Sequence, residues 1–217
     1  MYVPKHFSET DISVLHALIS AQPLGTWVTQ GSDELLINHI PFYLEADRGD
    51  FGTLIGHVAR ANPVWKTLMP PTASVVIFQG PQAYISPSWY PSKEVDGKVV
   101  PTWNYVVAHA HGQPRIIEDR TRLLELVTHM TGIHEAGQAA PWKVSDAPPE
   151  FIDTLLGAIV GIEIPITKLT GKSKVSQNRP APDQRGTVAG LQAQGCAQAD
   201  DMARLIAGSA AQQRVRG

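Results

Sequence analysis

The sequence predicts an α+β fold in which a run of strands precedes most of the helices. About five segments with strand-like apolar patterns follow one another between residues 24 and 118. Two segments with apolar residues at helical spacing lie between residues 119 and 156. The 17 prolines and 18 glycines are spread along the chain. This order and composition are typical of a strand-rich α+β domain and not of alternating α/β units or a helical bundle.

The N-terminal segment predicts an amphipathic helix. Ser8 can cap it, and Asp11 three positions later would complete a capping box. The helical spacing then places four apolar residues on one face: Ile12, Leu15, Leu18 and Ile19.

A β-hairpin is expected next. Residues 24–29 form its first strand, residues 31–34 the turn and residues 35–44 the second strand. In the second strand the alternation assigns one face to Leu36, Ile40, Phe42 and Leu44.

The middle of the chain predicts further strands at residues 51–58 and 73–86, with a bend at Gly80-Pro81 in the longer one. Pro63 suits the first position of a short helix between them. Residues 100–111 and 115–118 are expected to pair as a hairpin around Gly112.

Helices dominate the later part. Asp119 can cap a helix with Leu123, Leu124, Val127 and Met130 on its apolar side, and Ser145 and Asp146 can cap a second helix. A strand at 159–169 and one helix at 187–213 follow. We expect one domain at residues 1–191 and a helical, partly frayed tail at residues 192–217.

Composition limits the classes of function. The net charge of −2 argues against a surface that binds nucleic acid non-specifically. Cys196 is the only cysteine, which excludes an internal disulfide and zinc sites of the Cys/His type. The first 15 residues lack a signal-peptide pattern, and no stretch has the roughly 20 apolar residues of a membrane span. The sequence therefore predicts a cytoplasmic protein that does not enter the membrane.

A first cluster of candidate site residues follows the strand at 51–58. Arg60 and Lys66 flank the predicted start of a short helix, where backbone N–H groups and cations can together bind a phosphate. The alternative is that both cations are simply solvated.

A second cluster, residues 78–91, combines aromatic side chains, hydroxyl groups and three prolines. Such a loop either forms the wall of a ligand site, where rings stack on a planar heterocycle, or packs on a second subunit.

The third cluster lies in residues 100–111. Trp103 and Tyr105 share one strand face with His109 and His111, while Asn104 faces the other way. Two histidines at this spacing could bind a metal, but no third ligand is near in sequence, so no metal is predicted.

A fourth cluster, residues 171–179, is polar and basic. In an extended segment Lys172, Lys174 and Ser176 point to the same side and could close over an anion or over nucleic acid. A solvated turn is the alternative. Fingerprints of nucleotide-binding loops and of hydrolases are absent from the sequence.

Taken together, these clusters resemble the PaiB-like family of FMN-binding negative transcriptional regulators. The resemblance covers residues 1–191. It rests on MYVPKHF at residues 1–7, HVARANP at 57–63, IFQGPQAYISPSWYPSK at 77–93, VVPTWNYVVAHAH at 99–111, WKVSDAP at 142–148 and GKSKVSQNR at 171–179.

The resemblance implies a split β-barrel, as in pyridoxamine-phosphate oxidases, that forms a homodimer with FMN between the subunits. It also implies a set of cofactor-binding residues: His39, His57, Arg60, Asn62, Lys66, Tyr84, Ser86, Trp89, Trp103, Lys172, Lys174 and Gln177. Catalytic residues are not identified. The usual substrate-binding tail of the oxidases is missing, which argues against oxidation of pyridoxamine phosphate.

Three functions stay open at this point. The first is a flavin-binding negative transcriptional regulator, with Lys172, Lys174, Arg179 and Arg185 as the only dense basic run that could touch DNA. The second is an FMN-dependent oxidoreductase or flavin reductase, or a haem-handling relative that uses His109, His111 or His134. The third is a ligand carrier without catalytic activity.

Overall fold

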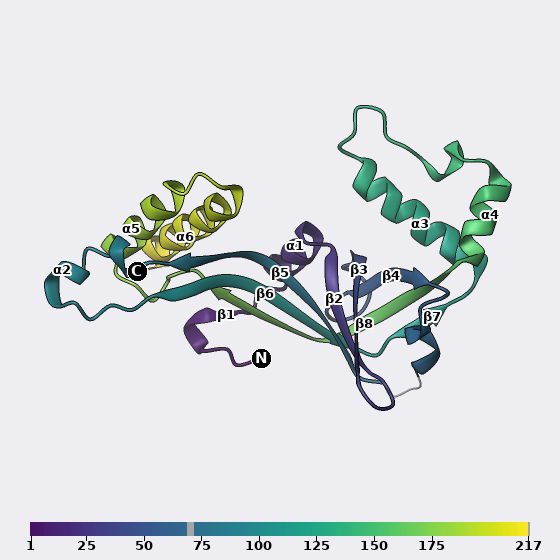
Figure 1. Ribbon diagram of the computed structural model, residues 1–217, viewed down its shortest axis with the longest axis horizontal. Coiled ribbons are helices and arrows are strands. Elements are labelled where there is room, and N and C mark those ends of the chain that lie inside the picture. The colour runs from purple at the N-terminus through teal and green to yellow at the C-terminus, as the bar shows by residue number, and fades with distance from the viewer. Residues whose placement is uncertain (69–71, 217) are drawn as a thin grey trace. The chain divides into compact units, whose positions relative to one another are not determined.

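The structure of the protein is a computed structural model that describes residues 1–68 and 72–216 (Figure 1). Its contacts divide the chain into two compact units. We call Met1–Leu15, Gln79–Ala108 and Thr170–Gly217 the first unit, and His16–Phe78 and His109–Leu169 the second unit.

The strands are β1 (Ser8–Glu9), β2 (Leu24–Gln30), β3 (Leu35–Glu45), β4 (Thr53–Ala59), β5 (Ser74–Ile85), β6 (Thr102–Gly112), β7 (Arg115–Ile117) and β8 (Ile159–Lys174). The α-helices are α1 (Ile12–Ala21), α2 (Lys93–Asp96), α3 (Arg120–Glu135), α4 (Pro149–Gly157), α5 (Ala181–Gln192) and α6 (Ala197–Arg216). Short 3-10 helices are η1 (Lys5–Phe7), η2 (Pro63–Thr67), η3 (Pro87–Trp89) and η4 (Val144–Asp146).

The strands form one sheet in the order β1-β8-β4-β3-β2-β5-β6, and an additional pairing joins β6 back to β8. This pairing closes the strands from β8 to β6 into a barrel, which confirms the α+β class and the split-barrel architecture. In the second unit the closure is tight, because a Cβ atom added at Gly112 would lie 2.3 Å from the carbonyl oxygen of Pro165.

The barrel core of the second unit follows from the alternation seen in the sequence. The hairpin of β2 and β3 is confirmed, with Thr26 opposite His39. Ile40 and Phe42 point inward and are buried, whereas Ile37 and His39 are exposed. Gly25 lies so close to Val76, Phe78 and Phe42 that a larger residue would overlap them.

Helices α3 and α4 cover an outer face of the second unit. The side chain of Asp119 accepts a hydrogen bond from the backbone N–H of Arg122, so the predicted cap of α3 is confirmed. The buried residues of α3 are Leu123, Leu126 and Met130, which pack with Ile55, Ile117 and Leu156. Of the four apolar residues expected on this side of α3, Leu123 and Met130 are buried, Val127 is partly buried and Leu124 is exposed.

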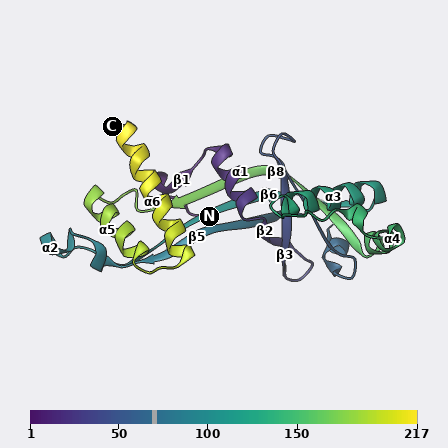
Figure 2. The same ribbon diagram turned by 90° about the horizontal axis from the view of Figure 1, so that it is seen from above.

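Helices α5 and α6 cover one face of the sheet in the first unit and lie side by side (Figures 1 and 2). Their core contains Leu191, Met202 and Ile206, packed with Ile85 and Val175 of the strands. Residues 197–206 of the predicted tail therefore contribute buried side chains to the first unit. Within the described residues, no helix is both long and apolar enough to cross a bilayer.

Several local expectations need correction. The first helix begins after Asp11, whose carboxylate accepts from the N–H of Ser13, and Ser8 lies instead in β1 opposite Lys172. The capping box at Ser8 fails because the pairing with β8 extends the backbone there. Gly80-Pro81 does not break β5, which is a single strand of 12 residues, and the bulge or bend expected there stays a prediction.

Two further corrections concern pairing and helix ends. Strand β7 pairs with β8, where Arg115 lies opposite Glu163, and not with β6 as a hairpin around Gly112. Ser145 and Asp146 form η4, and α4 begins later at Pro149. The single terminal helix is two helices, because Gly195 adopts a φ of 64° and breaks the chain direction.

Candidate functional site

The predicted cofactor-binding residues fall into two groups. The second unit holds five of them: His39, His57, Arg60, Asn62 and Lys66. The first unit holds seven: Tyr84, Ser86, Trp89, Trp103, Lys172, Lys174 and Gln177.

Arg60 follows β4 and is bound to the protein itself. Its Nη1 donates to Glu118 Oε1 at 2.8 Å, and its Nε and Nη2 donate to the carbonyl oxygens of Gly157 and Ile159 at 2.9 and 3.1 Å. Its guanidinium also lies 5.6 Å from the ring centroid of Trp65. A phosphate at Arg60 would therefore compete with Glu118 for the same cation.

Asn62 and Lys66 belong to η2 and its cap. The amide oxygen of Asn62 accepts from the N–H of Val64, and its Nδ2 donates to Asn38 Oδ1 at 2.7 Å. This confirms that Pro63 begins a short helix and explains why Asn62 precedes it. Lys66 is exposed, and its ammonium lies 5.4 Å from the Trp65 ring centroid.

His57 lies near the end of β4 and is largely withdrawn from water. Its Nδ1 is buried and has no hydrogen-bond partner in the described residues. Desolvation lowers the pKa of His57, so the imidazole is neutral at pH 7. His39 is exposed on β3 opposite Thr26.

The face of the first unit's sheet opposite α5 and α6 carries aromatic and cationic side chains, and Tyr2 and Phe7 of the N-terminal segment contact its lysines. The alternation of β5 and β6 turns Ala83, Ile85 and Val106 toward those helices. The intervening residues of β5 and β6, with two lysines of β8, make up what we call the Lys-aromatic face: Gln82, Tyr84, Trp103, Tyr105, Lys172 and Lys174.

The two lysines of this face are partly desolvated. Lys172 is 8% exposed, its Nζ donates to the Tyr2 carbonyl oxygen at 3.3 Å, and it lies 5.1 Å from the Tyr105 ring centroid. Lys174 donates to Thr102 Oγ1 and lies 5.8 Å from the ring centroid of Phe7. Neither lysine forms a salt bridge within the described part of the chain.

Lys172 and Lys174 together carry a positive charge that no carboxylate of the described residues neutralises. Desolvation lowers the pKa of Lys174, and the nearby cations of Lys172 and Arg179 lower it further, while Tyr105 works in the opposite direction. Two like charges two residues apart on one strand face repel each other. An anion bound between them would remove this repulsion.

Tyr84 and Trp103 form the aromatic part of the face. Their ring centroids lie 6.2 Å apart in an edge-to-face arrangement, and the side chains are 48% and 49% exposed as residues. Trp103 Nε1 donates to Gln82 Oε1 at 3.1 Å, which fixes the indole and leaves the Gln82 amide N–H groups available for a ligand.

Three other predicted residues of the first unit have local roles. Ser86 accepts from the N–H of Ser88 and caps η3. The indole of Trp89 packs on α5, where a Cβ atom at Gly190 would lie 2.3 Å from it. Gln177 bonds the backbone of the turn after β8, since Nε2 donates to the Ser173 carbonyl and Oε1 accepts from the N–H of Val175.

The turn after β8 depends on Asn104, which the sequence did not single out as a site residue. Its Nδ2 donates to Ser176 Oγ at 2.8 Å from a fully buried position, and Ser176 adopts a φ of 60°. Such a backbone conformation is unusual for a residue with a side chain and must be held by its surroundings. Asn104 thereby fixes the end of the strand that carries Lys174.

Tyr105 and Gln82 were also missed as site residues. The signal was present in the sequence, because each lies two positions from a predicted site residue of its own strand, Trp103 and Tyr84 respectively.

The histidines considered for metal or haem do not form a cluster. The rings of His109 and His111 lie 6.4 Å apart, and desolvation lowers the pKa of both. Within the described residues, no three His, Cys, Asp or Glu side chains come together as metal ligands.

Comparison with known proteins identifies the family. Residues 1–168 match the family described as "Putative FMN-binding domain". The chain belongs to this family. FMN is accordingly the cofactor that membership assigns to the chain.

Curated relatives match along most of their length. "Protease synthase and sporulation protein PAI 2" of Bacillus subtilis is 32% identical over 95% of this chain and 96% of its own. "Uncharacterized protein AN0679" of Emericella nidulans is 34% identical over 88% of this chain and 90% of its own.

Solved structures share the fold at low identity. The flavocytochrome Anf3 of Azotobacter vinelandii has a TM-score of 0.56 and 13% identity, covering 79% of this chain and 72% of its own. The FAD and heme binding protein of Mycobacterium smegmatis has a TM-score of 0.56 and 16% identity, covering 77% and 73%.

The chemistry of the Lys-aromatic face fits FMN. The cofactor has a phosphate, a polyhydroxylated chain and a planar heterocycle with a polar edge. Lys172 and Lys174 supply cations for a phosphate, Tyr84 and Trp103 supply rings for stacking, and Gln82 supplies amide donors. The three strands that carry these residues are neighbours and span about 10 Å, which suits an elongated ligand.

Proposed function

We propose that the chain binds FMN on the Lys-aromatic face of the first unit. The observation that carries this proposal is the pair of lysines, Lys172 and Lys174, which lies beside aromatic rings without a carboxylate partner in the described residues. Holding two desolvated cations together costs free energy in the absence of a ligand. A phosphate dianion bound between the two lysines would remove this unfavourable free energy, and the gain would contribute to the affinity.

Each part of the face has a separate role in this proposal. Lys172 and Lys174 hold the phosphate, Tyr105 keeps the Lys172 ammonium in place through its ring, and Trp103 and Tyr84 contact the heterocycle. Bound FMN would supply one- and two-electron transfer. The protein contributes the position of the cofactor and the positive potential near its phosphate.

Titration of the purified protein with FMN, followed by quenching of flavin fluorescence, tests the site. Replacing both lysines, Lys172→Met and Lys174→Met, removes the charges but keeps most of the apolar stem. We expect the affinity for FMN to fall about 10- to 150-fold for each charge-assisted hydrogen bond of about 1.5–3 kcal/mol that is lost. Riboflavin, which lacks the phosphate, should bind both forms with similar affinity.

Lys168→Met is the matched control, because Lys168 is an exposed lysine of the same strand outside the face. It should bind FMN like the unchanged protein. Equal FMN affinity of the double variant and the control would overturn the proposed site. Trp103→Ala should weaken FMN and riboflavin alike, since it removes a ring contact and no charge.

We further propose that the FMN-bound chain acts as a negative transcriptional regulator. The support is the resemblance to a family of such regulators and the similarity to PAI 2, a protein named for protease synthesis and sporulation, along 95% of this chain. The proposed regulation does not use direct DNA contact by the basic run. Arg179 lies 4.8 Å from the Tyr90 ring centroid, and the first turns of α6 carry Asp200 and Asp201, which would repel a DNA backbone.

A reporter assay combined with a DNA-binding assay separates direct from indirect regulation. We expect repression in cells to be lost in the double lysine variant and retained in Lys168→Met. Purified protein should not change the electrophoretic mobility of promoter DNA. Protein binding that retards the DNA and weakens steeply with salt concentration would contradict indirect regulation.

An FMN-dependent oxidoreductase or flavin reductase is the second candidate. The observation that favours it is the exposure of Tyr84 and Trp103, since a heterocycle stacked on an open face stays accessible to a soluble electron donor. Turnover of NADH or NADPH with added FMN, in excess of the rate of free FMN, tests this activity. A rate equal to that of free FMN would exclude it.

We also propose that the protein is a homodimer. The exposed side chains of Val95 and Val100, which the proposed flavin contacts do not involve, give the first unit an apolar surface that a second copy could cover. Mass measurement in solution with and without FMN tests this assignment, and a monomer under both conditions would contradict it.

A further inference from the structure

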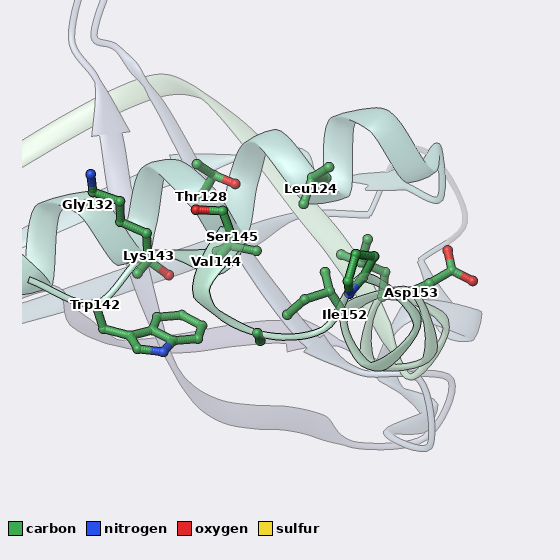
Figure 3. Close-up of a pocket in the computed structure, with 13 residues that line it drawn as sticks. Leu124, Thr128, Gly132, Trp142, Lys143, Val144, Ser145, Ile152 and Asp153 are labelled. Carbon is green, nitrogen blue, oxygen red and sulfur yellow. The ribbon is translucent and has the colours of Figure 1, made fainter.

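The second unit contains a cavity of about 610 Å³ that the proposed flavin site does not involve (Figure 3). It lies between α3, η4 and α4. Its wall is mostly apolar and includes Leu124, Trp142, Val144, Ile152 and Leu156. This volume is within the range of about 300–1,000 Å³ that is typical of small-molecule sites.

Hydrogen bonds hold the segment that forms one wall. The carboxylate of Glu135, near the end of α3, accepts from the backbone N–H of Trp142 at 3.0 Å. Asp146 accepts from the backbone N–H of Lys143 at 2.9 Å. Both ends of the turn 142–146 are therefore fixed, and its 3-10 helix η4 lies in contact with α3.

The charges at the two ends of the cavity differ. Asp153 is paired with Arg120, so its charge is compensated. Lys143, beside Trp142 at the other end, is exposed and forms no salt bridge within the described residues (Figure 3). Hydroxyl groups of Thr128, Thr131 and Ser145 lie along the wall as possible hydrogen-bond partners.

We propose that this cavity binds a small amphipathic carboxylate, with its carboxylate at Lys143 and its apolar body along Val144, Ile152 and Leu156. A lysine at one end of an apolar wall favours an apolar molecule with one anionic group over an uncharged one, since the carboxylates of Glu135 and Asp146 at the same end are already bonded to backbone N–H groups. The site belongs to the second unit and does not depend on the proposed flavin site.

Decanoate is a suitable probe, measured by isothermal titration calorimetry, with decanol as the uncharged analogue. We expect one saturable site for decanoate and weaker binding of decanol. Lys143→Glu should weaken decanoate about 3- to 10-fold, as expected for reversing one exposed charge. Lys168→Glu, which reverses an exposed lysine away from the cavity, should leave decanoate binding unchanged.

Gly132→Leu tests the cavity without removing any contact. Gly132 lies on the wall, and no atom lies within 4 Å of a Cβ atom built there, so a leucine would fill the cavity. We expect it to abolish decanoate binding, to leave the thermal unfolding temperature unchanged or higher, and to leave FMN affinity unchanged. Gly208→Leu in α6, also without a neighbour within 4 Å, should bind decanoate normally.

The same experiments state what would overturn the proposal. Absence of saturable decanoate binding up to millimolar concentration would do so, as would full binding by Gly132→Leu. A dimer that Gly132→Leu converts to a monomer would assign the cavity to a second copy of the chain and would also overturn it. If the unchanged protein binds decanoate normally but does not bind FMN, the result would count against the flavin site alone.

Discussion

The ammonium of Lys172 lies 5.1 Å from the centroid of the Tyr105 ring, and its only polar contact among the described residues is the Tyr2 carbonyl oxygen at 3.3 Å. The quadrupole of the ring stabilises the cation where water and carboxylates do not. Lys174 lies two residues further along the same strand with a similar environment. The first unit thus keeps a positive charge ready for an anion at some cost to its own stability.

Lys174→Met should stabilise the protein in the absence of FMN. Desolvation lowers the pKa of Lys174 below its ordinary value of 10.5, so the unfolded chain binds more protons than the folded one between the two values. The stability of the unchanged protein should therefore rise with pH through that window, and the variant should lack this rise. Thermal unfolding at several pH values tests this, with an increase of a few degrees expected for the variant at pH 7.

The control for this prediction is Lys168→Met, which should change neither the unfolding temperature at pH 7 nor its pH dependence in that window. A lower unfolding temperature for Lys174→Met would mean that the bond to Thr102 outweighs the desolvation of the ammonium.

Arg60→Ala should lower stability more than it lowers FMN affinity. The guanidinium holds two carbonyl oxygens, those of Gly157 and Ile159, and pairs with Glu118. Losing these donors should cost about 1–3 kcal/mol in the free energy of unfolding, measured with urea. FMN affinity should change less than about threefold if the phosphate lies at the lysines of the first unit.

Glu118→Gln separates the two roles of Arg60. If Arg60 binds the phosphate, as the sequence predicts, releasing it from Glu118 should increase FMN affinity. If it only holds the backbone, FMN affinity should stay the same. A tighter FMN complex in Glu118→Gln would therefore restore Arg60 to the cofactor site.

Local signals in the sequence predicted local structure well. The hairpin of β2 and β3, the cap at Asp119 and the helix start at Pro63 are confirmed because each depends on residues within a few positions. The partner of β7 could not be predicted in this way. Arg115 pairs opposite Glu163, 48 residues further along, and only the closed sheet determines that choice.

The same distinction applies to the candidate site. The alternation correctly put Lys172 and Lys174 on one side of an extended strand, but that strand ends at Lys174, and Ser176, which was expected on the same side, lies in the following turn with a φ of 60°. The sequence could not show that Glu118 would pair with Arg60, or that Gly190 would receive the indole of Trp89. A cation, and likewise a ring, has the same sequence pattern whether its partner is a ligand or a distant part of the chain.

Glu163→Gln should destabilise the second unit. This carboxylate of β8 is 4% exposed as a side chain and lies 2.6 Å from Arg48 and 2.8 Å from Arg122, with Arg115 at 3.7 Å. Burial works to raise the pKa of Glu163, but the hydrogen bonds and charges of Arg48 and Arg122 outweigh it and leave the pKa below its ordinary value. The variant should lose about 1–3 kcal/mol at pH 7.

The pH dependence gives this prediction a second readout. A carboxylate with a lowered pKa contributes stability above its unfolded pKa of about 4.5 and loses that contribution as the pH falls through the lowered value. The difference between the unchanged protein and Glu163→Gln should shrink accordingly in acid. Asp47→Asn, an exposed carboxylate in the same unit, should show neither effect.

Gly190→Ala tests whether Trp89 packs on α5 or contacts the flavin. A Cβ atom at Gly190 would lie 2.3 Å from the indole, so the ring must move, at a cost of about 1–3 kcal/mol in the free energy of unfolding. We expect that loss with FMN affinity unchanged, because the Lys-aromatic face does not include Trp89.

Gly208→Ala is the matched control: α6 has open space there, and replacing glycine in a helix should stabilise by about 0.5–1 kcal/mol. If FMN affinity fell in Gly190→Ala in parallel with stability, while Gly208→Ala bound normally, Trp89 would have to belong to the flavin site as the sequence predicted.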